Sequence, residues 1–190
     1  MRRLVVGCGY LGARVARAWR DAGDEVYGTT RGGQVDALSR SGVHPLILDV
    51  TAGPVSRGLP AVDTVLFAVA RDRNSDATMF DIHVTGLRAV LDGLAASASR
   101  VIYVSTTGVY GQDQGEWVDE ASVTDPVREG GRACLAAERM LAGHERGRDA
   151  VVLRWPGSRS TTVRPPRISF SSTTASMQVR SLFRSPSRLR

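Results

Sequence analysis

The chain has 190 residues, of which 42% are hydrophobic, and no apolar run approaches the roughly 18 residues that a membrane-spanning helix requires. Its formal net charge is +6, but residues 157–190 hold seven arginines and no acid, whereas residues 1–156 hold 18 arginines and 19 acids. Because the larger part has a net charge of −1, we expect one globular domain without a nucleic-acid-binding face.

Short apolar segments alternate with segments of helical periodicity up to about residue 155. The apolar segments predict six strands, at 3–7, 25–29, 45–49, 64–69, 101–105 and 150–154. The intervening segments predict helices at 10–23, 35–40, from about 76 to 98, and 128–141. Strands separated by helices indicate an α/β fold with a parallel sheet and right-handed crossovers.

The N-terminal residues MRRLVVGCGYLGA resemble a secretion signal, with two arginines before an apolar stretch. That stretch is short and is interrupted by three glycines, so we expect a cytoplasmic protein instead. Cys8 and Cys134 have no metal-ligand spacing around them, and we expect two free thiols and no metal site.

The sequence GCGYLG follows the first predicted strand and opens the first helix, which is the context of a dinucleotide-binding turn. Gly7 permits the tight turn, Gly9 lets a pyrophosphate approach the backbone, and Gly12 lets the helix pack on the strand. Free N–H groups at the helix start, around Tyr10 and Leu11, attract phosphate. The turn therefore predicts a doubly wound, Rossmann-type sheet with strand order 3-2-1-4-5-6; a turn without a ligand is the alternative.

The end of the second strand bears on the choice of cofactor. It carries Thr30 and Arg31 where an acid would hold the ribose 2′-hydroxyl of NAD. Arg31 can pair with a 2′-phosphate, so we predict NADP(H), with NAD and a solvated surface arginine as the alternatives. Asp49, the last residue of the third predicted strand, either accepts a hydrogen bond from the adenine amino group or forms a turn. Ala68 and Val69, at the end of the fourth predicted strand, are expected to line the same site.

The segment YVSTTGVYG, at 103–111, resembles the SS-x-x-VYG motif of the extended short-chain dehydrogenases/reductases, the NAD-dependent epimerase/dehydratase family. The similarity runs from residue 3 to about 157. Other similar segments are LFAVA at 66–70, HVTGLRAVL at 83–91 with His83 in place of the usual asparagine, GEWVDEASVTDP at 115–126, and LAAERML at 135–141.

The resemblance implies that a Ser/Thr binds the substrate oxygen and that a tyrosine, assisted by a lysine four residues on, transfers the proton. Thr106 takes the Ser/Thr position. The tyrosine position falls on Gly130 and the lysine position on Cys134, and the chain contains no lysine. Tyr110 is either a substitute acid or a packing residue.

Other charged groups on the fourth predicted helix and the loop before it have simpler interpretations. Arg132 could place positive charge near the site, although a guanidinium does not replace an amine, and a solvated helix arginine is the alternative. Cys134 is interpreted as an inert thiol, with a reactive thiol as the alternative. We interpret Glu120 as a loop carboxylate and Glu138 as a helix-surface carboxylate.

Residues 157–190 are rich in serine and arginine and lack acids. They are interpreted as a disordered tail, as an RNA-binding segment, or as a frameshift product. The frameshift is conceivable because, with GC-rich codons, the reading frame one base earlier can encode a different peptide. In the resembled family a C-terminal lobe shapes the substrate pocket, and here we expect it to be truncated or replaced by this tail. Uncovered apolar surface would then favour aggregation or a homodimer.

These observations lead to three functional hypotheses. The first is an NADP(H)-binding protein of the epimerase/dehydratase type with weak or absent redox activity. The second is an active reductase or epimerase that acts on a carbonyl or nucleotide-sugar substrate through Thr106 and Tyr110. The third is an interaction protein whose partner surface responds to NADP(H).

Overall fold

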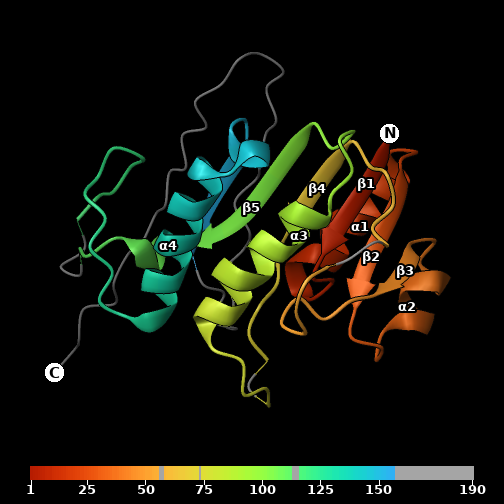
Figure 1. Cartoon of the computed structure of the whole chain (residues 1–190), viewed down its shortest axis with the longest axis horizontal. Helices are drawn as coiled ribbons and strands as arrows, with labels where there is room; N and C mark the ends of the chain where they lie inside the picture. The colour runs from red at the N-terminus through yellow and green to blue at the C-terminus, as the bar shows by residue number, and fades with distance from the viewer. Residues whose placement is uncertain (56–57, 73, 113–115, 157–190) are drawn as a thin grey trace, which may run out of the picture.

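Six parallel strands form one sheet in the order β3-β2-β1-β4-β5-β6 (Figure 1). The computed structural model describes residues 1–55, 58–72, 74–112 and 116–156. The strands are β1 (Arg2–Val6), β2 (Glu25–Thr30), β3 (His44–Ile47), β4 (Thr64–Phe67), β5 (Arg100–Thr106) and β6 (Val151–Trp155). The predicted parallel sheet and its strand order are confirmed, whereas the serine- and arginine-rich segment at 157–190 lies outside the described residues.

Helical segments connect most of the strands. The α-helices are α1 (Tyr10–Asp21), α2 (Val35–Arg40), α3 (Leu87–Gly93) and α4 (Glu129–Gly143). Three other helical segments are the π-helix η1 (Asp81–Gly86) and the 3-10 helices η2 (Thr107–Val109) and η3 (Glu145–Gly147).

The helix predicted from about 76 to 98 is shorter in the structure. Thr78 and Asp81 bond to each other at its start: the Thr78 N–H and hydroxyl both donate to Asp81, and the Asp81 N–H donates to the Thr78 hydroxyl. This reciprocal capping begins the helix after Thr78. It ends at Gly93, because Leu94 is in an extended conformation. Its first part is the π-helix η1, a form that is rare in globular proteins.

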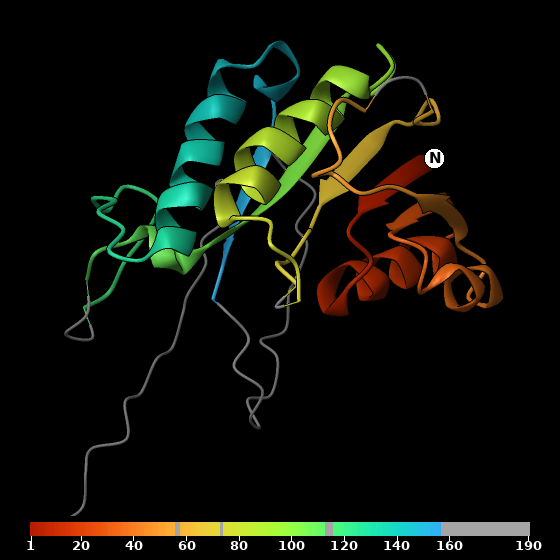
Figure 2. The same ribbon diagram turned by 60° about the horizontal axis from the view of Figure 1, so that its bottom comes forward.

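Two hydrophobic cores lie on the two faces of the sheet. In β1, Leu4 and Val6 point to the core beneath α3 and α4, and Val5 points to the core beneath α1 and α2. Figure 2 shows the two helix pairs on opposite sides of the strands. In β5, Tyr103 faces α3 and α4, so the alternation of a strand directs Ser105 to the same side.

The register of the strands places the loops that follow them at one edge. Val6 of β1 pairs with Phe67 of β4, so Gly7 and Ala68 leave the sheet side by side. Thr30 of β2 pairs with Ile47 of β3, and the two strands end at the same edge. This edge is where open parallel sheets bind ligands.

Candidate functional site

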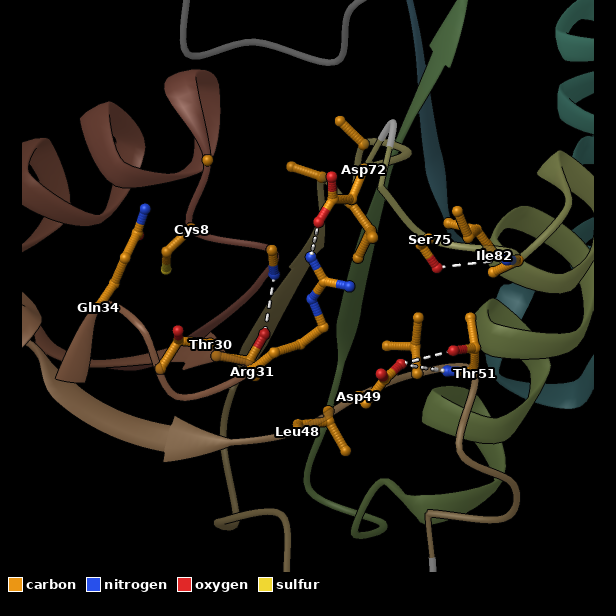
Figure 3. A pocket seen from close by; sticks show the side chains of 18 of the residues that line it. Cys8, Thr30, Arg31, Gln34, Leu48, Asp49, Thr51, Asp72, Ser75 and Ile82 are labelled. Atoms are coloured by element: carbon orange, nitrogen blue, oxygen red, sulfur yellow. Dashed lines mark hydrogen bonds and ion pairs between the residues drawn. The ribbon is translucent and has the colours of Figure 1, made fainter.

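A cavity of about 440 Å³ lies at the carboxyl ends of β1 to β4. It spans the point at which the strand order reverses, because β2 and β4 flank β1 on its two sides. Figure 3 shows it from close by. The described residues that line it are Gly7, Cys8, Gly9, Thr29, Thr30, Arg31, Gly33, Gln34, Leu48, Asp49, Val50, Thr51, Ala68, Val69, Ala70, Asp72, Ser75, Ala77 and Ile82.

The three glycines of the turn between β1 and α1 differ in what requires them. Gly7 has a φ of +93°, and a Cβ there would lie 2.8 Å from the Val69 Cα. A Cβ on Gly12 would lie 2.1 Å from the Gly7 carbonyl oxygen, so this contact between α1 and the turn allows only glycine. At Gly9, by contrast, a Cβ would meet no described atom within 4 Å. The protein itself leaves the space in front of Gly9 open, on the side of the cavity that Gly9 lines.

Thr29 of β2 fixes the turn in place. Its buried hydroxyl accepts the Gly7 N–H at 2.9 Å, and its carbonyl accepts the Cys8 N–H at 3.3 Å. Cys8 is buried, and burial raises the pKa of its thiol to about 11. This thiol therefore stays protonated near neutral pH, as expected for an inert cysteine.

The start of α1 carries free backbone donors. Gly9 is the N-cap residue, and in the described part of the chain neither a capping side chain nor a first-turn acid meets the N–H groups that follow. Arg14, one turn on, has its guanidinium carbon 3.6 Å from the centre of the exposed Tyr10 ring and donates to the Tyr10 carbonyl at 2.9 Å. The helix dipole and Arg14 together make this end of α1 attractive to an anion.

Three charged side chains meet at the other end of the cavity (Figure 3). The Arg31 Nη2 lies 2.5 Å from the Asp72 Oδ2, although 41 residues separate them in sequence. The Asn74 N–H and then Arg31 lower the pKa of Asp72. Asp49 accepts the hydroxyl and the N–H of Thr51, at 2.7 and 2.9 Å, and these bonds lower its pKa. Both carboxylates are therefore ionised at neutral pH.

Most of the residues predicted to bind a cofactor line this cavity. They are Gly7, Gly9, Thr30, Arg31, Asp49, Ala68 and Val69. Tyr10, Leu11 and Gly12 lie on α1 outside the lining, and Gly12 acts through packing. Sequence reasoning missed Thr29, whose β-branched side chain at a strand end gave no sign of its bond to Gly7. It also missed Asp72, which only the path of the loop after β4 brings to Arg31.

The predicted catalytic residues lie at β5 and just after it, outside the lining of the cavity. The Thr106 hydroxyl accepts the Gly108 N–H at 3.1 Å. The Tyr110 hydroxyl accepts from the Arg154 Nη1 at 2.8 Å and donates to the Asp119 carbonyl at 2.8 Å. These two bonds fit the packing alternative for Tyr110, which joins the loop before α4 to β6.

The two positions of the missing tyrosine and lysine lie on α4. At Gly130, a Cβ would meet only the Met79 Cε, at 3.4 Å, so no close contact of the described residues demands glycine there. Cys134 is 3% exposed, and burial raises the pKa of its thiol. Beside it, the Tyr103 hydroxyl and the His83 Nδ1 are 2.9 Å apart, and burial lowers the pKa of His83 to about 4. His83 is therefore neutral at physiological pH.

The interpretation of Glu138 as a surface carboxylate is wrong. Its side chain is 10% exposed, accepts the Ser105 hydroxyl at 2.5 Å and pairs with Arg154 at 2.8 Å. Glu138 follows Cys134 by one helical turn, so it shares the face of α4 that packs on β5 and β6. Arg132, on the same helix, donates to the Pro126 and Val127 carbonyls and so holds the loop before α4.

Two further properties concern the described residues as a set. Among them, no three histidine, cysteine, aspartate or glutamate side chains are grouped so as to hold a metal ion. None of their helices has the length and apolar character needed to cross a membrane.

Comparison with known proteins extends these observations. The family model of the NAD dependent epimerase/dehydratase family matches residues 3–159. No curated protein matches the chain. A solved structure from Methylobacillus flagellatus, provisionally described as an NAD-dependent epimerase/dehydratase, is 32% identical with a TM-score of 0.62, over 80% of this chain and 53% of that one.

Two solved structures share the fold at lower identity. One is a short-chain dehydrogenase/reductase superfamily protein from Agrobacterium tumefaciens with bound NAD, 24% identical, TM-score 0.64, covering 81% of this chain and 48% of that one. The other is UDP-glucuronic acid 4-epimerase from Bacillus cereus with NAD, 20% identical, TM-score 0.63, covering 82% and 56%. This chain thus spans about half the length of such proteins. Over residues 3–159 it belongs to the NAD dependent epimerase/dehydratase family.

Proposed function

We propose that the chain binds a nicotinamide adenine dinucleotide in the cavity at the carboxyl ends of β1 to β4. The observation that carries this proposal is the open space at Gly9, in front of an α1 start with free N–H groups. Gly7 and Gly12 are explained by contacts within the protein, whereas the open space at Gly9, which lines the cavity, allows a ligand to approach the backbone closely. The NAD bound in two structures of the same fold supports this assignment.

The lining residues fit the parts of a dinucleotide. The start of α1 would hold the pyrophosphate, with Arg14 adding positive charge at the same end. Leu48 and Asp49 would contact the adenine, and Arg31 would contact the adenosine ribose. When bound, the nicotinamide would supply hydride transfer; the residues named here bind and orient the cofactor.

We further propose that the chain binds NADP(H) more tightly than NAD(H). Among the described residues that line the cavity, Arg31 carries the one cationic side chain. A guanidinium pairs with a 2′-phosphate through charge-assisted hydrogen bonds, which a 2′-hydroxyl cannot match. Asp72 and Asp49 share the surroundings of Arg31 and oppose this preference. The selectivity for NADP(H) is therefore expected to be modest.

Redox activity is proposed to be weak or absent. Glycine at 130 offers no acid/base group, and the protonated Cys134 thiol cannot supply the positive charge of a lysine amine. His83 is buried and neutral, and its Nδ1 is bonded to Tyr103. None of these three residues lines the cavity, and none of them places a proton-transfer group there.

One observation favours an active reductase or epimerase as a second candidate. Arg154 donates to the Tyr110 hydroxyl at 2.8 Å, and its guanidinium carbon lies 5.0 Å from the centre of the ring. Arg154 thus places a fixed cation beside the phenol in a chain that contains no lysine. Turnover of carbonyl or nucleotide-sugar substrates that falls in Thr106→Val would support this candidate. Turnover unchanged in that variant would contradict it.

Calorimetric titration of the full chain with NADPH and then with NADH tests the main proposal. We expect a dissociation constant on the order of micromolar for NADPH and weaker binding of NADH. Failure of a folded chain to bind either dinucleotide would contradict the proposed function.

A further inference from the structure

The ion pair between Arg31 and Asp72 joins two sides of the cavity. Arg31 follows β2 and Asp72 lies in the loop after β4, and both side chains line the cavity (Figure 3). Their side chains are 52% and 38% exposed, so the pair lies where solvent and a ligand can reach it. Arg31 is therefore already bonded to a carboxylate before any phosphate arrives.

The two partners differ in how firmly they are held. The Asp72 carboxylate also accepts the Asn74 N–H at 2.9 Å, which fixes it to its own loop. Arg31 has a long, half-exposed side chain whose only hydrogen bond among the described residues is the one to Asp72. If the pair opens, Arg31 is the partner that moves and the Asp72 charge stays in the cavity.

The local charge balance adds to this argument. Asp49, which also lines the cavity, is close enough to Arg31 for their charges to interact. One guanidinium thus lies among two carboxylates, so the net charge of this group is negative. A phosphate dianion that enters here meets repulsion from both carboxylates and competes with Asp72 for Arg31, whereas a ribose hydroxyl does neither.

We propose that Asp72 is a specificity-determining residue that opposes the preference of Arg31 for a 2′-phosphate. Its carboxylate occupies the guanidinium, and NADP(H) must displace it, while NAD(H) binds with the ion pair intact. This inference rests on the proposed dinucleotide binding and assigns the discrimination between the two cofactors to a pair of residues. Asp72 lies far from β2 in the sequence, so the residues at the end of β2 alone suggest a site without acids.

The variant Asp72→Asn tests this proposal, with Asp21→Asn as its matched control. Asp21 pairs with Arg20 at the far end of α1, away from the glycine turn, and its loss changes the net charge of the chain equally. In Asp72→Asn, we expect the dissociation constant for NADPH to fall about three- to tenfold and that for NADH to change less than about twofold. Asp21→Asn should change neither. Adenosine 2′,5′-bisphosphate and 5′-AMP should repeat the pattern without a nicotinamide.

The variant Arg31→Gln completes a double-mutant cycle. It should remove the preference for NADPH, and in its background Asp72→Asn should tighten NADPH less than it does in the native chain. An unchanged or weakened affinity of Asp72→Asn for NADPH overturns the proposal, as does equal tightening of both dinucleotides. If the native chain binds neither dinucleotide, the proposed function fails together with this inference. If it binds them and Asp72→Asn leaves their ratio unchanged, only this inference fails.

Discussion

The polar groups at the two halves of the sheet edge have different surroundings. Around β1 and β2, no side chain of the described residues caps the N–H groups at the start of α1, and the charged side chains line a cavity. Around β5 and β6, the polar side chains bond to one another: Tyr110 to Arg154, Arg154 to Glu138, and Glu138 to Ser105. The first half leaves a cavity open, and the second half uses its polar side chains for packing.

This difference indicates that a cofactor site and a catalytic site depend on different parts of the chain. The proposed pyrophosphate site depends mainly on backbone, namely the three glycines of the turn and the start of α1. Proton transfer needs particular side chains, and Gly130 and Cys134 do not provide them. Under the proposed function, this chain keeps the first site without the acid/base groups of the second.

The largest expected effect is on stability, from Gly12→Ala. Its Cβ would lie 2.1 Å from the Gly7 carbonyl oxygen, and the backbone of α1 would have to move away from the turn. We expect the free energy of unfolding to fall by about 3–5 kcal/mol, measured by urea denaturation. Gly9→Ala is the matched control, because the same added methyl meets no described atom within 4 Å. Equal losses in the two variants would contradict the distinction drawn between these glycines.

The second prediction concerns acid stability in the packed half. Burial lowers the pKa of His83 from 6.5 to about 4. Between these pH values the imidazole is protonated in the unfolded chain but stays neutral in the folded protein. The contribution is fully present above pH 6.5 and is lost as the pH falls towards 4. We expect a loss of about 2–3 kcal/mol across that range.

The variant His83→Asn isolates this contribution from that of the carboxylates. Its amide keeps a polar group beside the Tyr103 hydroxyl but does not titrate. Denaturation at several pH values should show a shallower loss of stability between pH 6.5 and 4 than in the native chain. Parallel curves for the two proteins would show that His83 titrates normally.

Much of this architecture could be predicted from the sequence because its signals are local. Apolar segments and glycine spacing predict the strands, their order and the turn at Gly7 to Gly12. The environments of Glu138 and Asp72 could not be predicted in this way. Glu138 stands directly before the charged Arg139 in sequence, and only the rotation of α4 on the sheet buries it. Asp72 meets Arg31 through the path of a loop, which no local pattern determines.

The third prediction tests whether Glu138 is structural. Glu138→Gln removes the charge that Arg154 pairs with in a partly buried place, so we expect a loss of about 1–2 kcal/mol in unfolding free energy. Glu120→Gln, at an exposed loop carboxylate, is the control and should have little effect. Dinucleotide binding should be unchanged in both variants, because neither residue lines the cavity. Loss of binding in Glu138→Gln would mean that the two halves are coupled.

The smallest expected effect is the one that sharpens the contrast most. Gly9→Val adds a branched side chain at a position where a Cβ meets no described atom within 4 Å, in an extended backbone conformation with a negative φ. We expect the melting temperature to stay unchanged and the affinity for NADPH to fall at least about tenfold, a free-energy change of about 1.4 kcal/mol, by calorimetry. If binding persists, the ligand does not approach this backbone and the space at Gly9 has another cause. If binding is lost while stability is kept, glycine at this position is required by a ligand and not by the fold, which is the property that separates this half of the molecule from the half built on β5 and β6.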